Sequence, residues 1–573
     1  MKRRAILLVG VLALAIGSRA GGAQPALPNR WVYLQTNLLV DANVASALAL
    51  LERSAQADYT GLVLTDSKFM RWDQLPPKYI ENVRKVRDAC RAARLDCIAS
   101  VCPIGYSNDL LSRDPNLAEG LPVVEAPFVV RGGRIVPADD SAVLVNGGFE
   151  EYKGDVPAGW RFVDMPGQIT FIDTQVKHDG RASLRLQDIG LHSPEHGNGR
   201  ACQTLKVHPF RYYHVSAFVK TENFEAAGEV RIAVLGEGGI ALQHANLNLA
   251  PTGDWKRVDV TFNSLEFSEV NLYLGVWGGK GGKIRWDKVR LEPGGLVNLV
   301  RRAGAPFKMT SEDGKIVYTE GKDFAGAVDP GLGTVPYPGN FTVWHEPPVM
   351  TVPAGSRLRD GQRVLASYYH TALIYGGQVT CCMSEPKVYE ILAWQVDQVR
   401  RNLAPDGYFM QHDEIRVQGY DASCAERKMT PGQILADNIK RCTEIIRRAD
   451  PAKPIYVWSD MFDPYHNARR TGRYYLVKGD GPWYGSWEGL DRDVIVVNWH
   501  GHAEGRLESL RHFAERGHKQ ILAGYYDGPP ERIRGWLADA DKVQGVVGVM
   551  YTTWQHRYDD LEAFTAELNK SGE

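Results

Sequence analysis

The sequence has almost no excess of charge of either sign. It holds 67 Lys and Arg against 68 Asp and Glu in 573 residues, which gives a formal net charge of -1. Binding to a polyanion such as nucleic acid depends largely on a surplus of cationic side chains. The balance therefore argues against nucleic acid as a partner.

Several catalytic and metal-binding motifs are also missing. The chain has no GxSxG nucleophile elbow, and GGKGGK (278–283) lies between strand-like segments, where it indicates a turn and not a phosphate-binding loop. No His or Cys spacing matches a zinc site, including that in NWHGHAEG (498–505). The sequence therefore predicts no metal in the active site and no cofactor required for catalysis.

Long apolar runs are absent except at the N-terminus. Cationic residues 2–4 precede an apolar run at 5–17, and small residues follow it up to Ala23. This order is typical of a bacterial signal peptide, here residues 1–23, and no later run is long enough to span a membrane. We therefore expect an exported protein, periplasmic or extracellular. None of the eight Cys lies near the cleavage site, and we expect buried thiols or one or two disulfides.

Two stretches that mix strand and helix patterns flank a stretch of strands alone. Between 143 and 295, short alternating segments are separated by Gly, Asn and Pro, which is typical of an antiparallel β-sandwich. On either side, apolar strands alternate with amphipathic helices, which indicates a parallel sheet. We predict a (β/α)8 TIM-type barrel, residues 24–142 and 296–573, with an inserted antiparallel β-sandwich (jelly roll) at 143–295.

The strand count leaves one ambiguity. The patterns give nine candidate strands, one more than an eight-stranded barrel holds. The extra strand is CIASVC (97–102) or RVLASYYH (363–370), the two that flank the insertion. Leu296 to Pro353 mixes strand and turn signals, and we predict an elaborated loop there.

The sandwich resembles a known class of module. Its opening, VNGGFEE (145–151), and its close, IRWDKVRLEP (284–293), are similar to jelly-roll carbohydrate-binding modules of secreted glycosidases. This resemblance implies a structural calcium ion near the paired termini, with Asn146, Glu150 and Asp287 as candidate ligands. In the alternative interpretation, these three side chains only cap strands.

Polar and aromatic side chains gather at the carboxyl ends of the predicted barrel strands, where barrel enzymes carry their active sites. Aromatic rings offer flat faces to a sugar ring, and the polar groups can bind its hydroxyls. We therefore predict a pocket for a carbohydrate. Its candidate binding residues are Tyr369, His370, His412, Trp458, Asp460, Asn498, Trp499, Tyr526, Asp527, Tyr551 and Trp554.

The motif QHDEIR (411–416) places two adjacent carboxylates, Asp413 and Glu414, directly after an apolar strand. Glycoside cleavage needs an acid to protonate the leaving oxygen and a second group to stabilise the sugar cation. Adjacent carboxylates repel each other, so one of them can stay protonated near neutral pH. In the structural alternative, Asp413 caps a helix and Glu414 pairs with Arg416.

An Asp-Glu pair at a barrel strand end resembles the family 20 and family 123 β-N-acetylhexosaminidases. The resemblance implies that Glu414 is the general acid/base and that Asp413 orients the substrate's 2-acetamido group, whose oxygen attacks the anomeric carbon. It also implies a Tyr that hydrogen-bonds the acetamido oxygen, Tyr526 or Tyr551, and Trp walls that include Trp499 and Trp554. The sequence departs from the family 20 pattern at Gln411 and His412, where glycines are expected.

Two other functions remain open from the sequence. A conventional retaining glycosidase would use Glu414 as acid/base and Asp460 or Asp527 as nucleophile. A secreted glycan-binding protein would keep the barrel fold without catalysis. In each case the partner is a carbohydrate, while the oligomeric state and the role of the sandwich are left open.

Overall fold

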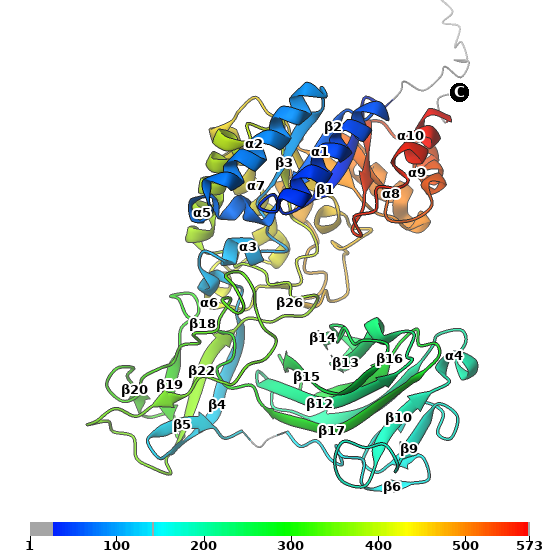
Figure 1. The fold of residues 1–573 in the computed structure, drawn as a ribbon. Coiled ribbons are helices and arrows are strands. Elements are labelled where there is room, and N and C mark those ends of the chain that lie inside the picture. Colours follow the sequence, from blue (N-terminus) through cyan, green and yellow to red (C-terminus); the bar gives the residue numbers. More distant parts are fainter. Residues whose placement is uncertain (1–26, 140–141, 571–573) are drawn as a thin grey trace, which may run out of the picture.

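The computed structural model describes residues 27–139 and 142–570, so the predicted signal peptide (1–23) lies outside the described residues. Eight strands form a closed barrel (Figure 1). They are, in order around the barrel, β1 (Asn29–Gln35), β2 (Gly61–Thr65), β3 (Asp96–Val101), β23 (Gly407–Met410), β25 (Ile455–Trp458), β27 (Ile495–Asn498), β28 (Gln520–Tyr525) and β29 (Val546–Thr552). Every neighbouring pair is parallel, and β29 closes the barrel on β1. The prediction of a closed eight-stranded barrel is confirmed.

Helices cover the outside of the barrel. Their bounds are α1 (Asp41–Gln56), α2 (Pro77–Ala92), α5 (Pro386–Asn402), α7 (Pro431–Ala449), α8 (Ala503–Glu515), α9 (Ile533–Ala540) and α10 (Leu561–Lys570). Between β25 and β27 the connection holds only the 3₁₀ turns η6 (Asp460–Phe462) and η7 (Ser486–Gly489) and the short strand β26 (Leu476–Val477). The strict strand–helix alternation of a (β/α)8 barrel is therefore met only in part.

The barrel strands are apolar on both faces because one face packs inside the barrel and the other packs against helices. Side chains alternate along each strand, so that Phe409, Trp458 and Val497 point into the barrel, where they join an inner core. Their neighbours Met410 and Val496 belong to the outer core, which includes the helices. This alternation decides which strand-end residues reach the interior.

RVLASYYH forms β22 (Arg363–His370), which lies outside the barrel, whereas CIASVC lies in barrel strand β3. β22 pairs antiparallel with β4 (Leu121–Arg131) in a separate sheet. The predicted loop at 296–353 contributes short strands to the same region: β18 (Leu299–Val300), β19 (Lys308–Ser311), β20 (Val317–Tyr318) and β21 (Met350–Thr351). The ninth candidate strand is thus part of an antiparallel sheet beside the sandwich.

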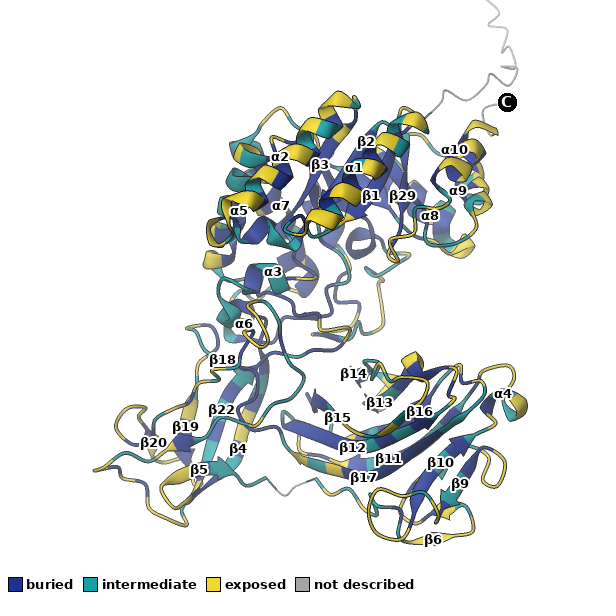
Figure 2. Cartoon of the chain, viewed as in Figure 1, coloured by how far each residue is buried: buried dark blue, intermediate teal, exposed yellow. Residues whose placement is uncertain are grey.

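Two five-stranded antiparallel sheets form the sandwich. One sheet contains β9 (Thr170–Asp173), β10 (Ser183–Gln187), β12 (Tyr212–Glu222), β15 (Gly253–Asn263) and β17 (Lys283–Pro293). The other contains β8 (Phe162–Val163), β11 (Gly199–Lys206), β13 (Val230–Leu235), β14 (Ala241–Gln243) and β16 (Glu269–Val276). Apolar side chains from both sheets, Trp286 and Leu274 among them, form a buried core. Figure 2 shows long buried stretches along the strands of both sheets.

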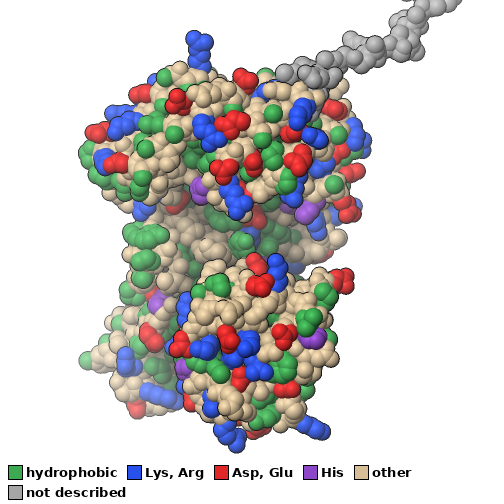
Figure 3. All heavy atoms as spheres, turned by 45° about the vertical axis from the view of Figure 1, so that its right-hand side comes forward, with side chains coloured by type: hydrophobic (Ala, Val, Ile, Leu, Met, Phe, Trp, Pro, Cys, Tyr) green, Lys and Arg blue, Asp and Glu red, His purple; other side chains and the backbone are tan. Residues whose placement is uncertain are grey.

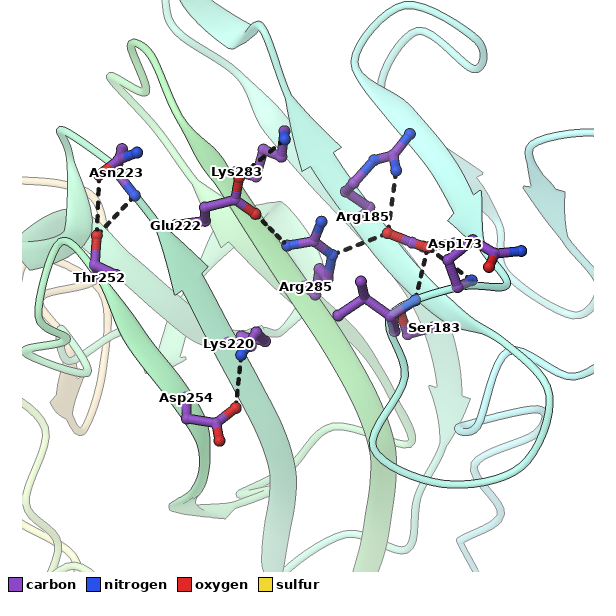
Figure 4. Close-up of polar contacts among 12 residues, drawn as sticks. Asp173, Ser183, Arg185, Lys220, Glu222, Asn223, Thr252, Asp254, Lys283 and Arg285 are labelled. Carbon is purple, nitrogen blue, oxygen red and sulfur yellow. Dashed lines mark hydrogen bonds and ion pairs between the residues drawn. The ribbon is translucent and has the colours of Figure 1, made fainter.

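The outer face of the first sheet is charged. Along β17, Ile284 and Trp286 point into the core, while Lys283 and Arg285 point outward. Figure 4 shows Arg285 between Asp173 and Glu222. Its guanidinium nitrogens lie 2.9 Å from an Asp173 oxygen and 3.2 Å from a Glu222 oxygen. Apolar and charged residues alternate along this strand because one face of the sheet packs against the core and the other face is polar.

The calcium site stays a prediction. Asn146 and Glu150 flank one turn and Asp287 lies on β17, and their side-chain oxygens accept hydrogen bonds from protein N–H groups. Asn146 accepts from the Glu151 N–H at 3.2 Å, and Glu150 accepts from the Arg181 N–H at 2.8 Å. Asp287 accepts from the His178 N–H at 2.8 Å. These contacts are compatible with the alternative interpretation, in which the residues only cap strands, and that interpretation also stays a prediction.

The sandwich packs on loops that follow barrel strands. Its core continues into Val417, Tyr420 and Leu476, which belong to the connections after β23 and β25. Figure 3 shows the surface hollowed between the barrel above and the sandwich below. All eight Cys are buried free thiols. Within residues 27–139 and 142–570, no helix combines the length and apolar composition needed to cross a membrane.

Candidate active site

A cavity of about 570 Å³ opens at the carboxyl ends of the barrel strands, and we call it the barrel cavity. Every one of the eight strands, or the residues directly after it, contributes to the wall. The strand-end residues are Gln35, Thr65, Ser100, Asp413, Trp458, Trp499, Tyr526 and Trp554. The cavity therefore occupies the place where barrel enzymes carry out their chemistry.

Asp413 and Glu414 both line the barrel cavity, although neighbours on a regular strand point in opposite directions. The strand ends at Met410, and Glu414 has a φ of 46°, which turns its side chain toward the same space. Gly105 permits this turn, because a Cβ atom at that position would lie 1.7 Å from the Asp413 carbonyl oxygen. Two loops thus fix the backbone of the pair.

Glu414 has two side-chain partners. Tyr106 donates a hydrogen bond from its hydroxyl to Oε2 at 2.6 Å, and the Arg416 guanidinium lies 2.7 Å from Oε1. Arg416 is buried and stands 4.6 Å from the ring centre of Tyr375. The ion pair that we expected in the structural alternative is therefore present, and Glu414 also faces the cavity with 30% of its side chain exposed.

Burial raises the pKa of Asp413 well above its usual range, and the nearby Asp460 and Glu414 raise it further. A carboxyl group in this environment keeps its proton when ordinary carboxyl groups have lost theirs. The pair therefore combines a carboxyl group whose pKa is raised with a second one that contacts a guanidinium. Such a difference between adjacent carboxyl groups is what acid–base catalysis requires.

Asp460 lies behind the wall and holds it in position. Its carboxylate accepts hydrogen bonds from the Glu414 N–H at 2.9 Å, the Asn467 side-chain amide at 2.9 Å and the Trp499 indole N–H at 3.1 Å. Burial raises its pKa to about 7. Asp460 thus orients both a candidate catalytic residue and an aromatic wall.

Asp527 has a similar role beside β29. It accepts a hydrogen bond from the Trp554 N–H at 2.8 Å and binds the Thr553 hydroxyl.

Trp554 is 42% exposed and stands at the mouth, 6.1 Å from Tyr526 and 5.4 Å from Tyr33 between ring centres. Trp499 stacks on Tyr526 with the rings 9° from parallel and their centres 6.0 Å apart. The result is a continuous aromatic wall.

Three predicted binding residues point away from the barrel cavity. His412 donates a hydrogen bond to Asn438 on α7 at 2.8 Å, and Asn498 donates one to Ser509 on α8 at 2.8 Å. Tyr551 stacks on Tyr525 with ring centres 4.0 Å apart. Each lies next to an inward-facing residue along the chain, so the alternating direction of successive side chains turns it toward the helices.

Tyr369 and His370 are also placed elsewhere, because β22 lies outside the barrel. His370 accepts a hydrogen bond from Asn263 at 3.0 Å and stacks on Tyr212, with ring centres 3.6 Å apart. Burial lowers its pKa to about 3. This histidine therefore joins the sandwich to β22 and does not line the barrel cavity.

The structure adds residues that the sequence interpretation missed. Tyr33, Gln35, Thr65 and Ser100 line the cavity from the first three barrel strands, and Asp66, Tyr106 and Asp109 line it from the loops that follow. Burial raises the pKa of Asp109 to about 7. The ends of WVYLQT, GLVLTD and CIASVC would have indicated most of them, since all parallel strand ends meet at one rim.

The sandwich also reaches this rim. His244, directly after β14, lies 6.1 Å from Tyr375 and 5.2 Å from Tyr475 between ring centres. The neighbouring Gln243 donates a hydrogen bond to the Leu373 carbonyl oxygen at 3.1 Å, which ties the loop that carries Tyr375 to the sandwich. The inserted domain thus stands against one side of the cavity mouth.

No protein-family model matches the sequence, and no curated protein matches it. Among solved structures, a family 16 carbohydrate-binding module is similar over 26% of this chain and 97% of its own, at 17% identity and a TM-score of 0.18. The rhamnosidase from Novosphingobium sp. PP1Y is similar over 96% of this chain and 59% of its own, at 11% identity and a TM-score of 0.32. The chitobiase of Flavobacterium johnsoniae is similar over 35% of this chain and 33% of its own, at 16% identity and a TM-score of 0.24. Similarities of this size assign no activity, which has to be argued from the site itself.

Proposed function

We propose that this protein is a glycoside hydrolase that cleaves its substrate in the barrel cavity with Asp413 and Glu414. One observation carries the proposal: the adjacent carboxyl groups open together into a cavity whose walls include Trp458, Trp499 and Trp554. Acid–base groups and flat aromatic faces in one cavity fit the hydrolysis of a sugar acetal. The exported location that the N-terminus predicts fits a carbohydrate substrate outside the cytoplasm.

We further propose that the substrate is a β-N-acetylhexosaminide, a β-N-acetylgalactosaminide included, and that its own acetamido oxygen is the nucleophile. A substrate amide N–H that donates to Asp413 favours the Asp413 carboxylate and leaves the proton of the pair on Glu414. Glu414 gives this proton to the glycosidic oxygen while the acetamido oxygen bonds to the anomeric carbon and the glycosidic bond breaks. Glu414 then takes a proton from the water that opens the oxazolinium ring.

In the mechanism that we propose, a protein side chain donates a hydrogen bond to the acetamido oxygen. Tyr526 lines the barrel cavity, whereas Tyr551 donates its hydroxyl proton to the Arg557 carbonyl oxygen at 2.8 Å. The geometry therefore favours Tyr526 for this role. Trp499, stacked on Tyr526, would hold the acetamido methyl group against an apolar face.

A protein nucleophile on Asp460 or Asp527 is less consistent with the structure. Asp460 accepts three hydrogen bonds and is fully buried behind Trp499. Asp527 is bound to Thr553 and to the Trp554 N–H. Neither side chain lines the barrel cavity, and a nucleophile has to reach the anomeric carbon directly.

The roles within the pair have one alternative, which the raised pKa of Asp413 favours. Asp413 would then be the general acid, and Glu414, paired with Arg416, would bind the substrate. The two assignments predict that different variants stay active on a substrate with an activated leaving group, because the departing oxygen of such a substrate needs little protonation. The acid variant keeps its rate on a 2,4-dinitrophenyl glycoside and loses it on a methyl glycoside. Comparing Asp413→Asn and Glu414→Gln on both substrates identifies the acid.

The proposal is tested with a panel of 4-nitrophenyl glycosides, in which 2-acetamido and 2-hydroxy sugars are compared side by side. We expect turnover of 2-acetamido sugars that is lost in Asp413→Ala and Glu414→Gln. Glu81→Gln, an exposed carboxylate on α2, is the matched control and keeps full activity. Turnover of 2-hydroxy sugars alone would contradict the proposal of substrate assistance. Glycan binding without any turnover would contradict the proposal that the protein is an enzyme.

A further inference from the structure

A second cluster of reactive side chains lies away from the barrel cavity. Glu119, Cys382, Asp421 and Cys424 are all fully or almost fully buried, and one ligand atom from each lies within 4.8 Å of the others. None of the four lines the barrel cavity. They come from three segments: the chain before β4, the chain before α5, and the start of α6 (Ala422–Glu426).

The spacing of the atoms fits a tetrahedral metal site. The two thiol sulfurs are 3.6 Å apart, and the Cys424 sulfur is 3.6 Å from Glu119 Oε2. Zinc binds thiolate sulfur at about 2.3 Å and carboxylate oxygen at about 2.0–2.2 Å, so tetrahedral geometry separates such ligands by roughly 3.5–3.8 Å. Two sulfurs and two oxygens form a donor set that zinc accepts.

The charges around the cluster leave room for a cation. Arg302 contacts Asp421 and also lies 2.8 Å from Glu385, so its guanidinium is shared between these two carboxylates. Glu119 is fully buried beside these groups. A buried carboxylate without a counter-charge is unfavourable, and a dication would remove that cost.

A further observation concerns Gln418, which is fully buried. Its side-chain N–H donates to the Cys424 sulfur at 2.9 Å, which places the amide against the cluster. Its Oε1 atom has no hydrogen-bond partner among the described residues. A buried amide oxygen of this kind normally has a partner, so we expect a polar group beside the cluster that the described residues do not supply.

We propose that Glu119, Cys382, Asp421 and Cys424 bind one divalent zinc-class cation in a closed structural site. Binding releases the thiol protons to solvent and involves no oxidation or reduction. The site joins three loops, and Asp421 lies seven residues after Glu414 in the chain. Glu119 also accepts hydrogen bonds from the Gly419 N–H at 2.8 Å and the Tyr420 N–H at 3.1 Å. The metal therefore fixes the segment that leads away from the catalytic pair, and this proposal does not depend on glycoside hydrolysis.

The test uses the exported chain, purified without chelator and without a polyhistidine tag. Elemental analysis is expected to find one zinc per chain in the unmodified protein and in Cys202→Ser, a buried cysteine of the sandwich that serves as matched control. Cys382→Ser and Cys424→Ser are expected to lose the metal. Removing it with a chelator is expected to lower Tm, and adding zinc back to restore it.

A spectroscopic measurement on the unmodified chain keeps the test valid if the variants fail to fold. Replacing zinc with Co²⁺ is expected to give the visible bands of a tetrahedral site and a near-ultraviolet thiolate charge-transfer band. Two results would overturn the proposal. One is a metal-free chain with eight titratable thiols that takes up no Co²⁺, and the other is a peptide in which Cys382 and Cys424 form a disulfide.

Discussion

Buried carboxylates in the sandwich and in the barrel stand in opposite environments. Asp173 on the sandwich face lies 2.9 Å from Arg285 and 3.0 Å from Arg185. Burial raises its pKa, but the Val176 N–H and Arg285 outweigh it and lower the pKa to about 2. For Asp460, burial outweighs the N–H groups of Glu414 and Trp499, and the pKa rises to about 7.

The difference lies in the counter-charges. Cations surround the sandwich carboxylate, so its ionised form contributes to stability. The carboxyl groups at the barrel mouth face one another, and Asp413 has the carboxylates of Asp460 and Glu414 as its neighbours. Such an arrangement is unfavourable for folding, and perturbed carboxyl groups of this kind gather at catalytic sites. The charges of the sandwich therefore stabilise its structure, whereas the mechanism that we propose uses those of the barrel for chemistry.

The comparison of the two regions predicts that the largest effect, a loss of activity, follows substitution of Glu414. Glu414→Gln removes the proposed acid/base and is expected to lower kcat by about 10²–10⁴-fold, the usual contribution of a general acid–base residue. The measurement is the steady-state rate on the best 4-nitrophenyl substrate, with circular dichroism to confirm the fold. A variant that keeps normal turnover would remove Glu414 from the mechanism.

The second prediction concerns stability in the sandwich. Asp173→Asn is expected to lower the free energy of unfolding by about 2 kcal/mol at pH 7, because Arg285 and the Val176 N–H stabilise the ionised side chain and lower its pKa to about 2. Because the folded pKa is depressed, this contribution is present above about pH 4 and is lost as the pH falls toward 2. Urea unfolding at pH 7 and pH 3 measures it, while catalysis is expected to stay unchanged.

Asp254→Asn on the same sheet is the matched control for Asp173→Asn. Asp254 pairs with Lys220 (Figure 4). The two charged groups lie 2.6 Å apart, but 85% of the Asp254 side chain is exposed. Exposed ion pairs contribute little, so its loss is expected to leave the unfolding curve unchanged. Equal effects of the two substitutions would contradict the role given to burial.

A smaller effect is expected at the mouth of the barrel cavity. Trp554→Ala removes an aromatic face that is 42% exposed, and we expect KM to rise about tenfold, which corresponds to about 1.4 kcal/mol. Trp554→Phe keeps a flat ring and is expected to recover most of the binding. If KM is unchanged in Trp554→Ala, the substrate does not stack on this wall.

The smallest effect tests whether the sandwich takes part in the site. His244→Ala is expected to raise KM a few-fold and leave kcat unchanged, because His244 stands beside Tyr375 at the rim. His192→Ala, on α4 (Ile189–His192) of the sandwich, is the control and changes neither constant. A drop in kcat with unchanged KM would show that His244 acts on the reacting groups instead.

Much of this arrangement could be predicted from the sequence, and some errors were avoidable. The apolar runs and their spacing indicated a parallel barrel, and the alternating segments indicated the sandwich. The same alternation, continued from Phe409 and Val497, would have placed His412 and Asn498 on the helix side. It would not have placed Tyr526, because Tyr525, Tyr526 and Asp527 all have positive φ and break the alternation.

Local apolar periodicity was enough to predict the closed barrel, the inserted antiparallel region and the position of Asp413 and Glu414 after a strand. The folded structure was needed to show that β22 lies outside the barrel, since strand patterns do not specify their partners. It also decided the distances at the site and brought Glu119 to Cys382, 263 residues apart in the chain. Contacts between such distant residues arise from packing, which no local pattern encodes.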